Sequence, residues 1–149
     1  MEEEYSKLQK EHDLPKLELL DKYFQVSNIE EKKFLLKEIT KKIHEKTHLF
    51  SSVLEDILSP EMISSSYESS LFSDEEKKEI LKLYKKLQFF NREYLMLEIS
   101  YDEKNQVEFI KEVMTQWENT TLELKKIVSK MKHSWNNDKK TKLELGYFG

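Results

Sequence analysis

The chain has 149 residues, of which 36% are charged, 2 are glycine and none is cysteine, and its formal net charge is −4. The lack of cysteine excludes a disulfide framework and a cysteine-ligated zinc site, and no apolar run approaches the ~18 residues of a membrane span. The acidic start Met1-Glu2-Glu3-Glu4 is unlike a secretory signal, so we expect a cytoplasmic protein that contacts no membrane.

Many charged residues and few glycines are typical of long helices with solvated faces. Residues 1–14 are expected to form a polar N-terminal extension. A short helix is predicted at 15–25, because Pro15 is tolerated in a first helical turn. Its apolar face consists of Leu17, Leu20 and Phe24.

A long helix is predicted at 29–58. Ser27 and Glu30 match a capping box at its start, and Ser59-Pro60 marks its end. Apolar residues recur at every seventh position along it: Ile29, Leu36, Ile43, Phe50 and Ile57. Residues 59–74 are rich in serine, which is unfavourable inside a helix because its hydroxyl competes for backbone hydrogen bonds. We therefore predict a linker there.

The stretch from residue 75 to residue 135 contains two apolar seams whose members are alternately three and four positions apart. This spacing places a whole seam on one stripe of a helix and is typical of left-handed packed pairs. The first seam is Ile80, Leu83, Leu87, Phe90, Tyr94, Leu97 and Tyr101, and the second is Val107, Ile110, Met114, Trp117, Thr121, Leu124, Val128, Met131 and Trp135. The seams are out of phase in the polar run 102–106. We interpret them as two helices, 75–101 and 104–135, that form an antiparallel hairpin, with one continuous helix as the alternative.

These elements predict an all-α fold. We expect an elongated antiparallel helical bundle with coiled-coil-like packing, built from three long helices and one short N-terminal helix. A single domain would cover residues 15–135. Phe89 and Phe109 widen the apolar stripes of the hairpin, so the helix at 29–58 is expected to cover it as a third surface.

One short motif could bind a metal. His44-Glu45-Lys46-Thr47-His48 matches H-E-x-x-H, in which two histidines one helical turn apart bind zinc and the glutamate activates water. The five residues resemble the zincin metalloprotease motif, which implies a zinc-dependent hydrolase with His44 and His48 as ligands and Glu45 as the catalytic base. However, counting from the Ile43 seam places both histidines on the charged face beside Lys41. We therefore interpret the match as coincidental and keep the hydrolase as an alternative.

Lysines cluster toward the C-terminal end of the chain: Lys125, Lys126, Lys130, Lys132, Lys139, Lys140 and Lys142. Aromatic residues lie among them, so the region 125–142 could hold a nucleic-acid backbone. Most of these lysines have a glutamate three or four positions away, as a solvated helix face also would. Arg92 is the sole arginine, which leaves little basis for bidentate readout of guanine. Nucleic-acid binding without sequence specificity is therefore a less favoured alternative.

The tail at 136–149 carries four apolar residues that could contact a partner or its own bundle: Leu143, Leu145, Tyr147 and Phe148. Its pattern Lys-Leu-Glu-Leu followed by Tyr-Phe, at 142–148, echoes the same pattern at 16–24, although the match is too short to establish a repeat. Long amphipathic helices without a complete catalytic constellation favour a non-enzymatic protein–protein interaction or scaffold module. Its partner would be another protein or a second copy of the chain, and no cofactor is expected.

Overall fold

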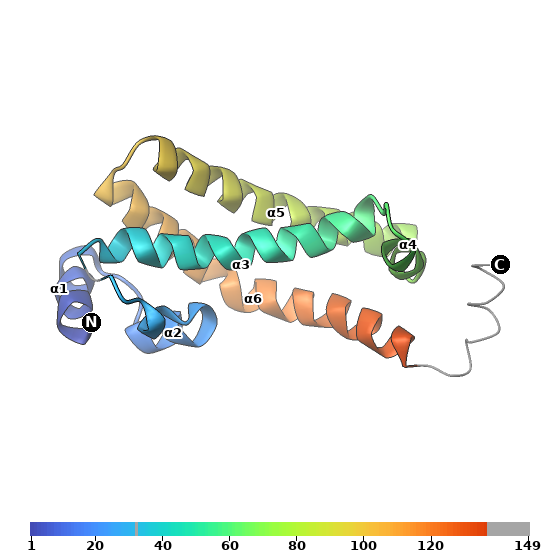
Figure 1. The fold of residues 1–149 in the computed structure, drawn as a ribbon, viewed down its shortest axis with the longest axis horizontal. Helices are drawn as coiled ribbons and strands as arrows, with labels where there is room; N and C mark the ends of the chain where they lie inside the picture. Colours follow the sequence, from blue (N-terminus) through green and yellow to red (C-terminus); the bar gives the residue numbers. More distant parts are fainter. Residues whose placement is uncertain (32, 137–149) are drawn as a thin grey trace.

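The computed structural model describes residues 1–31 and 33–136. These residues form helices and no strand, and the helices pack as a bundle, which confirms the predicted all-α class (Figure 1). The helices are α1 (Glu2–His12), α2 (Leu17–Phe24), α3 (Leu35–Leu58), α4 (Ile63–Ser70), α5 (Asp74–Ile99) and α6 (Glu103–Trp135), with a 3-10 turn, η1 (Val26–Asn28), after α2. The described part of the chain therefore has more helices than the three long and one short that we predicted.

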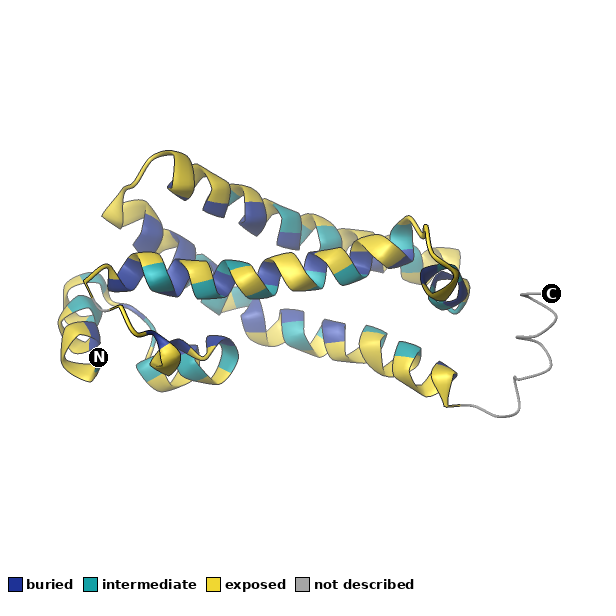
Figure 2. Cartoon of the chain, viewed as in Figure 1, coloured by how far each residue is buried: buried dark blue, intermediate teal, exposed yellow. Residues whose placement is uncertain are grey.

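The three long helices α3, α5 and α6 form the body of the bundle, and each contacts the other two. In Figure 1, α6 crosses α3, and its C-terminal half then runs away from α3. The short helix α2 lies against α3. The C-terminal half of α6 is accordingly more exposed than its first half, as Figure 2 shows.

The two out-of-phase seams lie on two separate helices that form a hairpin. Between them, Ser100 and Asp102 have extended backbones with φ of −140° and −154°, so the turn needs no residue of positive φ and no glycine. The Asp102 carboxylate begins α6 by accepting the backbone N–H of Lys104 at 2.9 Å. One continuous helix, the alternative interpretation, is therefore wrong.

Most seam residues are buried where three helices meet, but the ends of the seams are not. Tyr101 is 61% exposed, and Val128 and Trp135 on α6 are 45% and 50% exposed. Of the two residues expected to widen the apolar stripes, Phe109 is 2% exposed and buried in the core, whereas Phe89 is 56% exposed. A heptad pattern specifies which residues lie on one stripe of a helix. How much of that stripe is buried depends on the length and direction of the neighbouring helix.

The Ser-rich segment that we expected to be a linker contains helix α4. Its N-terminus is stabilised by Ser65, whose hydroxyl accepts the backbone N–H of Met62 at 3.0 Å. Tyr67 is buried and donates its hydroxyl to the carbonyl of Ser134 at 3.1 Å, and its ring lies 4.5 Å from that of Trp135. Contacts with the end of α6 therefore stabilise a helix that local propensity disfavours.

The third helix begins at Leu35, later than the predicted residue 29. Ser27 does not cap it, because the N-cap position of α3 is Phe34. The backbone N–H of Ser27 instead donates to the Asp21 carboxylate of α2 at 2.8 Å. Ile29 is still buried, at 6% exposure, but it packs from the segment between η1 and α3. The seven-residue spacing therefore correctly predicted that Ile29 is buried, but the prediction that Ile29 belongs to the helix was wrong.

The residues expected to form a polar extension include helix α1. Tyr5 is its buried side chain, at 1% exposure, and donates its hydroxyl to the carbonyl of Pro15. Burial raises the pKa of Tyr5 to about 12. Met1 and Leu8 beside it are partly buried against the same core, but most residues of this segment are charged or polar, so the sequence pattern did not predict this helix.

Candidate functional site

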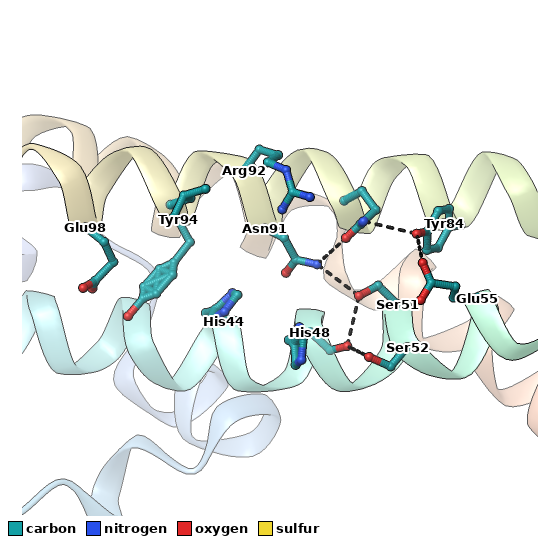
Figure 3. A pocket seen from close by; sticks show the side chains of 12 residues that line it. His44, His48, Ser51, Ser52, Glu55, Tyr84, Asn91, Arg92, Tyr94 and Glu98 are labelled. Atoms are coloured by element: carbon teal, nitrogen blue, oxygen red, sulfur yellow. Dashed lines mark hydrogen bonds between the residues drawn. The ribbon is translucent and has the colours of Figure 1, made fainter.

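A buried polar network joins α3 to α5, and its centre is Asn91 (Figure 3). The Asn91 amide oxygen accepts the hydroxyl of Thr47 at 2.7 Å. The amide nitrogen donates to the Ser51 hydroxyl at 3.0 Å and to the Gln88 side chain at 2.8 Å. Because these buried partners satisfy the amide, the network stabilises one register of α3 against α5.

A pocket of about 310 Å³ opens beside this network, between α3 and α5. We call it the histidine pocket. Its lining residues are His44, His48, Ser51, Ser52, Glu55, Tyr84, Gln88, Asn91, Arg92, Tyr94, Leu95 and Glu98. The sole arginine of the chain therefore lies at the same pocket as both histidines of the H-E-x-x-H pattern.

The position of His44 on the helix predicted a solvated side chain on the charged face. In the structure His44 is instead half-buried. Its ring lies 4.2 Å from the Tyr94 ring of α5 and 5.7 Å from the His48 ring (centroid distances). Burial first, and then the charge of His48, lower the pKa of His44, although Asn91 and Glu98 favour the protonated form. The tertiary contact with α5 therefore favours a neutral His44 at neutral pH.

The residues of the zinc hypothesis do not all meet at one pocket. His44 and His48 border the histidine pocket, whereas Glu45 is exposed, does not line it, and lies 4.0 Å from the Lys42 ammonium. Among residues 1–31 and 33–136, no group of three or more His, Cys, Asp or Glu side chains is placed to hold a metal ion. The geometry therefore offers two neighbouring histidines without the catalytic base.

Two carboxyl groups face each other between α5 and α6. Glu93 and Glu112 line a pocket of about 380 Å³ near the hairpin turn. Burial, followed by the charge of Glu112 and a hydrogen bond with it, raises the pKa of Glu93 to about 7. The sequence pattern did not single out this pair, because the two residues are on different helices and only the hairpin brings them together.

The predicted basic cluster is divided between two faces of α6. Lys126 and Lys130 line a pocket against α5, and the Lys130 ammonium bonds the Glu76 carboxylate at 2.9 Å. Lys125 and Lys132 instead face α3. The remaining members of the cluster, Lys139, Lys140 and Lys142, lie outside the described residues.

Aromatic side chains fill the space between α2, α3 and α6. Trp117 of α6 is 1% exposed, and its ring centroid lies 4.8 Å from that of Phe24 of α2 and 6.0 Å from that of Phe50 of α3. The short helix α2 therefore covers the cleft between α3 and α6 as far as this aromatic cluster.

Beyond the aromatic cluster the cleft continues as an open groove of about 620 Å³, which we call the α3–α6 groove. Its lining residues are Leu49, Phe50, Val53, Thr121, Leu124, Lys125, Val128, Ser129, Lys132 and His133. Leu49 is 52% and Val128 45% exposed, and no described acidic residue lines the groove. The groove thus combines an apolar floor with a basic rim.

Sequence reasoning did not find the α3–α6 groove, although one signal was present. The short helix at 15–25 could not cover the full length of a helix at 104–135. In the structure α2 has 8 residues and α6 has 33. The tail residues proposed for partner contact, Leu143, Leu145, Tyr147 and Phe148, lie outside the described residues.

No protein-family model matches the sequence, and neither a curated protein nor a solved structure matches it. In the described part of the chain, no helix combines the length and the apolar character that crossing a bilayer requires. The function must therefore be argued from the surfaces of this chain.

Proposed function

We propose that this protein is a non-enzymatic interaction module that binds an amphipathic helix of another protein in the α3–α6 groove. The observation that carries the proposal is the incomplete cover over the cleft between α3 and α6. Helix α2 occupies one part of the cleft, and the adjoining part presents an apolar floor that no helix among residues 1–31 and 33–136 covers. Exposed apolar surface bordered by polar residues is characteristic of protein-binding sites.

The way α2 binds indicates what the groove can accept. Leu20 and Phe24 of α2 are 0% and 2% exposed, and they are four positions apart, so one face of an amphipathic helix is enough to fill the cleft. From Thr121 to His133 the groove follows α6 for ~18 Å at 1.5 Å per residue. A partner helix of about three turns would therefore match its length.

The charge of the groove selects among such helices. Lys125, Lys132 and His133 border it, and no acidic residue among its lining neutralises them. Complementary charge favours a partner whose polar face is acidic, and it disfavours basic helices. The groove therefore fits an amphipathic helix with a leucine or aromatic stripe flanked by glutamate or aspartate.

A synthetic peptide provides the probe. It reproduces residues 15–26 of this chain with Lys16→Glu and Lys22→Glu, which keeps the apolar face of α2 and makes its polar face acidic. When it is added to the full chain, we expect methyl NMR signals of Leu49, Val53 and Val128 to shift in a saturable manner. The unmodified peptide should bind more weakly because it retains both lysines.

Charge reversal at the rim tests the specificity of this contact. Lys125→Glu with Lys132→Glu should weaken binding of the acidic peptide at least fivefold. The matched control, Lys41→Glu with Lys85→Glu, changes the net charge equally at exposed positions outside the groove and should leave the affinity unchanged. If a single-stranded oligonucleotide shifts the same methyl signals and the acidic peptide does not, the groove binds nucleic-acid backbone and the proposal fails.

A further inference from the structure

We propose that the histidine pocket binds a free amino acid, with Arg92 as the contact for its carboxylate and the glutamates Glu55 and Glu98 as countercharges for its ammonium group. The pocket lies between α3 and α5, so the proposal is independent of the α3–α6 groove and of its partner. Three features of the pocket lead to it: a polar floor fixed by its own hydrogen bonds, nitrogen groups without partners, and a lining that carries both signs of charge.

The floor of the pocket is held in one arrangement by its own side chains. Asn91 and Ser51 are each 4% exposed, and the Asn91 amide donates to Ser51 and to Gln88. The Gln88 amide in turn donates to the Tyr84 hydroxyl at 3.2 Å, and that hydroxyl donates to the Glu55 carboxylate at 2.7 Å. Because these bonds already order the floor, a ligand would not have to supply the free energy of ordering it.

Three nitrogen-bearing side chains at the pocket are not held by this network (Figure 3). Arg92 makes no hydrogen bond and no ion pair with any residue in 1–31 and 33–136, and no acidic residue lies three or four positions from it along α5. No described residue hydrogen-bonds the ring of His48. The Nδ1 atom of His44 is buried, also without a hydrogen-bond partner in the described part of the chain. Buried polar atoms without a partner are few in folded proteins, and a bound ligand is one explanation for them.

The side chain of Arg92 suits a carboxylate. The planar guanidinium can donate two parallel hydrogen bonds to both oxygens of a carboxylate, whereas a lysine ammonium acts as a point charge. Arg92 is the sole arginine in a chain that otherwise uses lysine for these cationic positions. The volume of the pocket, about 310 Å³, is at the lower end of the ~300–1,000 Å³ typical of ligand sites. The ligand is therefore a small molecule.

The glutamates of the lining determine the second charge of the ligand. In Figure 3, Glu98 and Glu55 lie at opposite ends of the pocket and Arg92 lies between them. With both imidazoles neutral, one guanidinium and two carboxylates give the lining a net charge of −1. A simple carboxylic acid or a phosphate would add to this negative charge. An amino acid adds none, and its ammonium group is attracted by the glutamates, so complementary charge favours it.

The remaining part of the lining can contact an apolar side chain. Leu95 is 49% exposed at the pocket, and the rings of Tyr84 and Tyr94 also line it. The Tyr94 ring is held in place by the His44 ring, at 4.2 Å between centroids. Aromatic surfaces favour packing against another ring, so phenylalanine is a suitable probe.

Titration of L-phenylalanine into the full chain tests the site. We expect saturable NMR shifts of the side-chain amide signals of Gln88 and Asn91 and of the methyl signals of Leu95. The methyl signals of Leu49 and Val128 in the α3–α6 groove should not move. N-acetyl-L-phenylalanine lacks the ammonium group and L-phenylalaninamide lacks the carboxylate, so each should bind at least fivefold more weakly.

Two kinds of variant assign the charges. Arg92→Lys keeps the charge without the fork and should weaken phenylalanine binding at least fivefold, and Arg92→Gln should weaken it further. The matched control, Lys85→Gln, removes the same charge from an exposed position of α5 outside the pocket and should leave the affinity unchanged. Glu55→Gln with Glu98→Gln should remove most of the difference in affinity between phenylalanine and its N-acetyl derivative.

Several results would overturn the proposal. One is the absence of saturable shifts at ~20 mM phenylalanine, at which a site with a Kd of ~1 mM is nearly full. Equal binding of the N-acetyl derivative would contradict the role of the glutamates, and equal binding of the amide would contradict that of Arg92. Unchanged affinity of Arg92→Gln, with a melting temperature equal to that of the wild-type chain, would also contradict it. None of these results affects the groove, because the acidic peptide is followed by different signals.

Discussion

The face of α3 that contacts α5 and the face that contacts α6 differ in how strictly they fix the position of the opposite helix. Against α5, the buried groups Thr47, Ser51 and Asn91 bond one another across the interface. Against α6, contact is apolar and aromatic up to Trp117, and beyond that it opens into the α3–α6 groove. A buried polar group left without its partner is costly, so the first face accepts one arrangement. An apolar groove has no such requirement and can accept different occupants.

The largest effect is expected where the cleft closes. Trp117→Ala removes the side chain on which α2 and α3 converge and should lower the free energy of unfolding by about 3–5 kcal/mol. Urea denaturation followed by circular dichroism measures the change. Leu122→Ala is the control, because Leu122 is on the same helix but 54% exposed, and its effect should stay within about 0.5 kcal/mol. Equal effects of the two substitutions would contradict the description of Trp117 as the closed end of the cleft.

A smaller loss is expected at the polar interface. Asn91→Ala leaves Thr47 and Ser51 without their partner across the interface, although both hydroxyls keep a bond within α3. The free energy of unfolding should therefore fall by about 1–3 kcal/mol. A double-mutant cycle with Thr47→Val measures the coupling between the two residues. A coupling energy below about 0.5 kcal/mol would show that the network does not define the register.

The smallest expected change in the free energy of unfolding comes from a substitution of Glu93. This substitution should stabilise the fold instead of destabilising it, and its effect depends on pH. The pKa of Glu93 is about 7 in the folded chain against an ordinary value of 4.5. Between these values the folded state holds a proton that the unfolded state has lost, so this group's contribution to stability falls as the pH rises through that range. Glu93→Gln cannot ionise and should therefore stabilise the fold at pH 8 by roughly 1 kcal/mol, because solvent screening reduces the effect of a partly exposed group.

Thermal melts of the wild-type chain and of Glu93→Gln at pH 8 and pH 4 provide the measurement, and the difference between them should nearly vanish at pH 4. The lowered pKa of His44 acts in the other direction, because it removes stability as the pH falls below about 6.5. It is present in both proteins and cancels in the comparison. Glu108→Gln removes an exposed charge from the same pocket, and a gain equal to that of Glu93→Gln would show that general repulsion is responsible.

Part of the candidate site could be read from the sequence. The histidine pair and the lysines were visible as patterns, and Val128 and Trp117 were recognised as members of one seam. The histidine pocket, the proximity of Glu93 to Glu112 and the division of the lysines between two faces could not be read in this way. Each depends on which helix lies opposite, and residue spacing within one helix contains no information about its neighbour.

By itself the sequence determined the helical class and several helix boundaries, because both arise from interactions within a few residues. Ser73 and Glu76, three positions apart, form a reciprocal capping box at the start of α5, and α3 ends at Leu58 before Ser59-Pro60. Only the tertiary structure decided that a serine-rich segment is helical, that His44 is half-buried, and that Val128 and Trp135 toward the end of the α6 seam are about half exposed. The physical reason is that burial requires a neighbour of sufficient length and suitable direction, and α2 ends before α6 does.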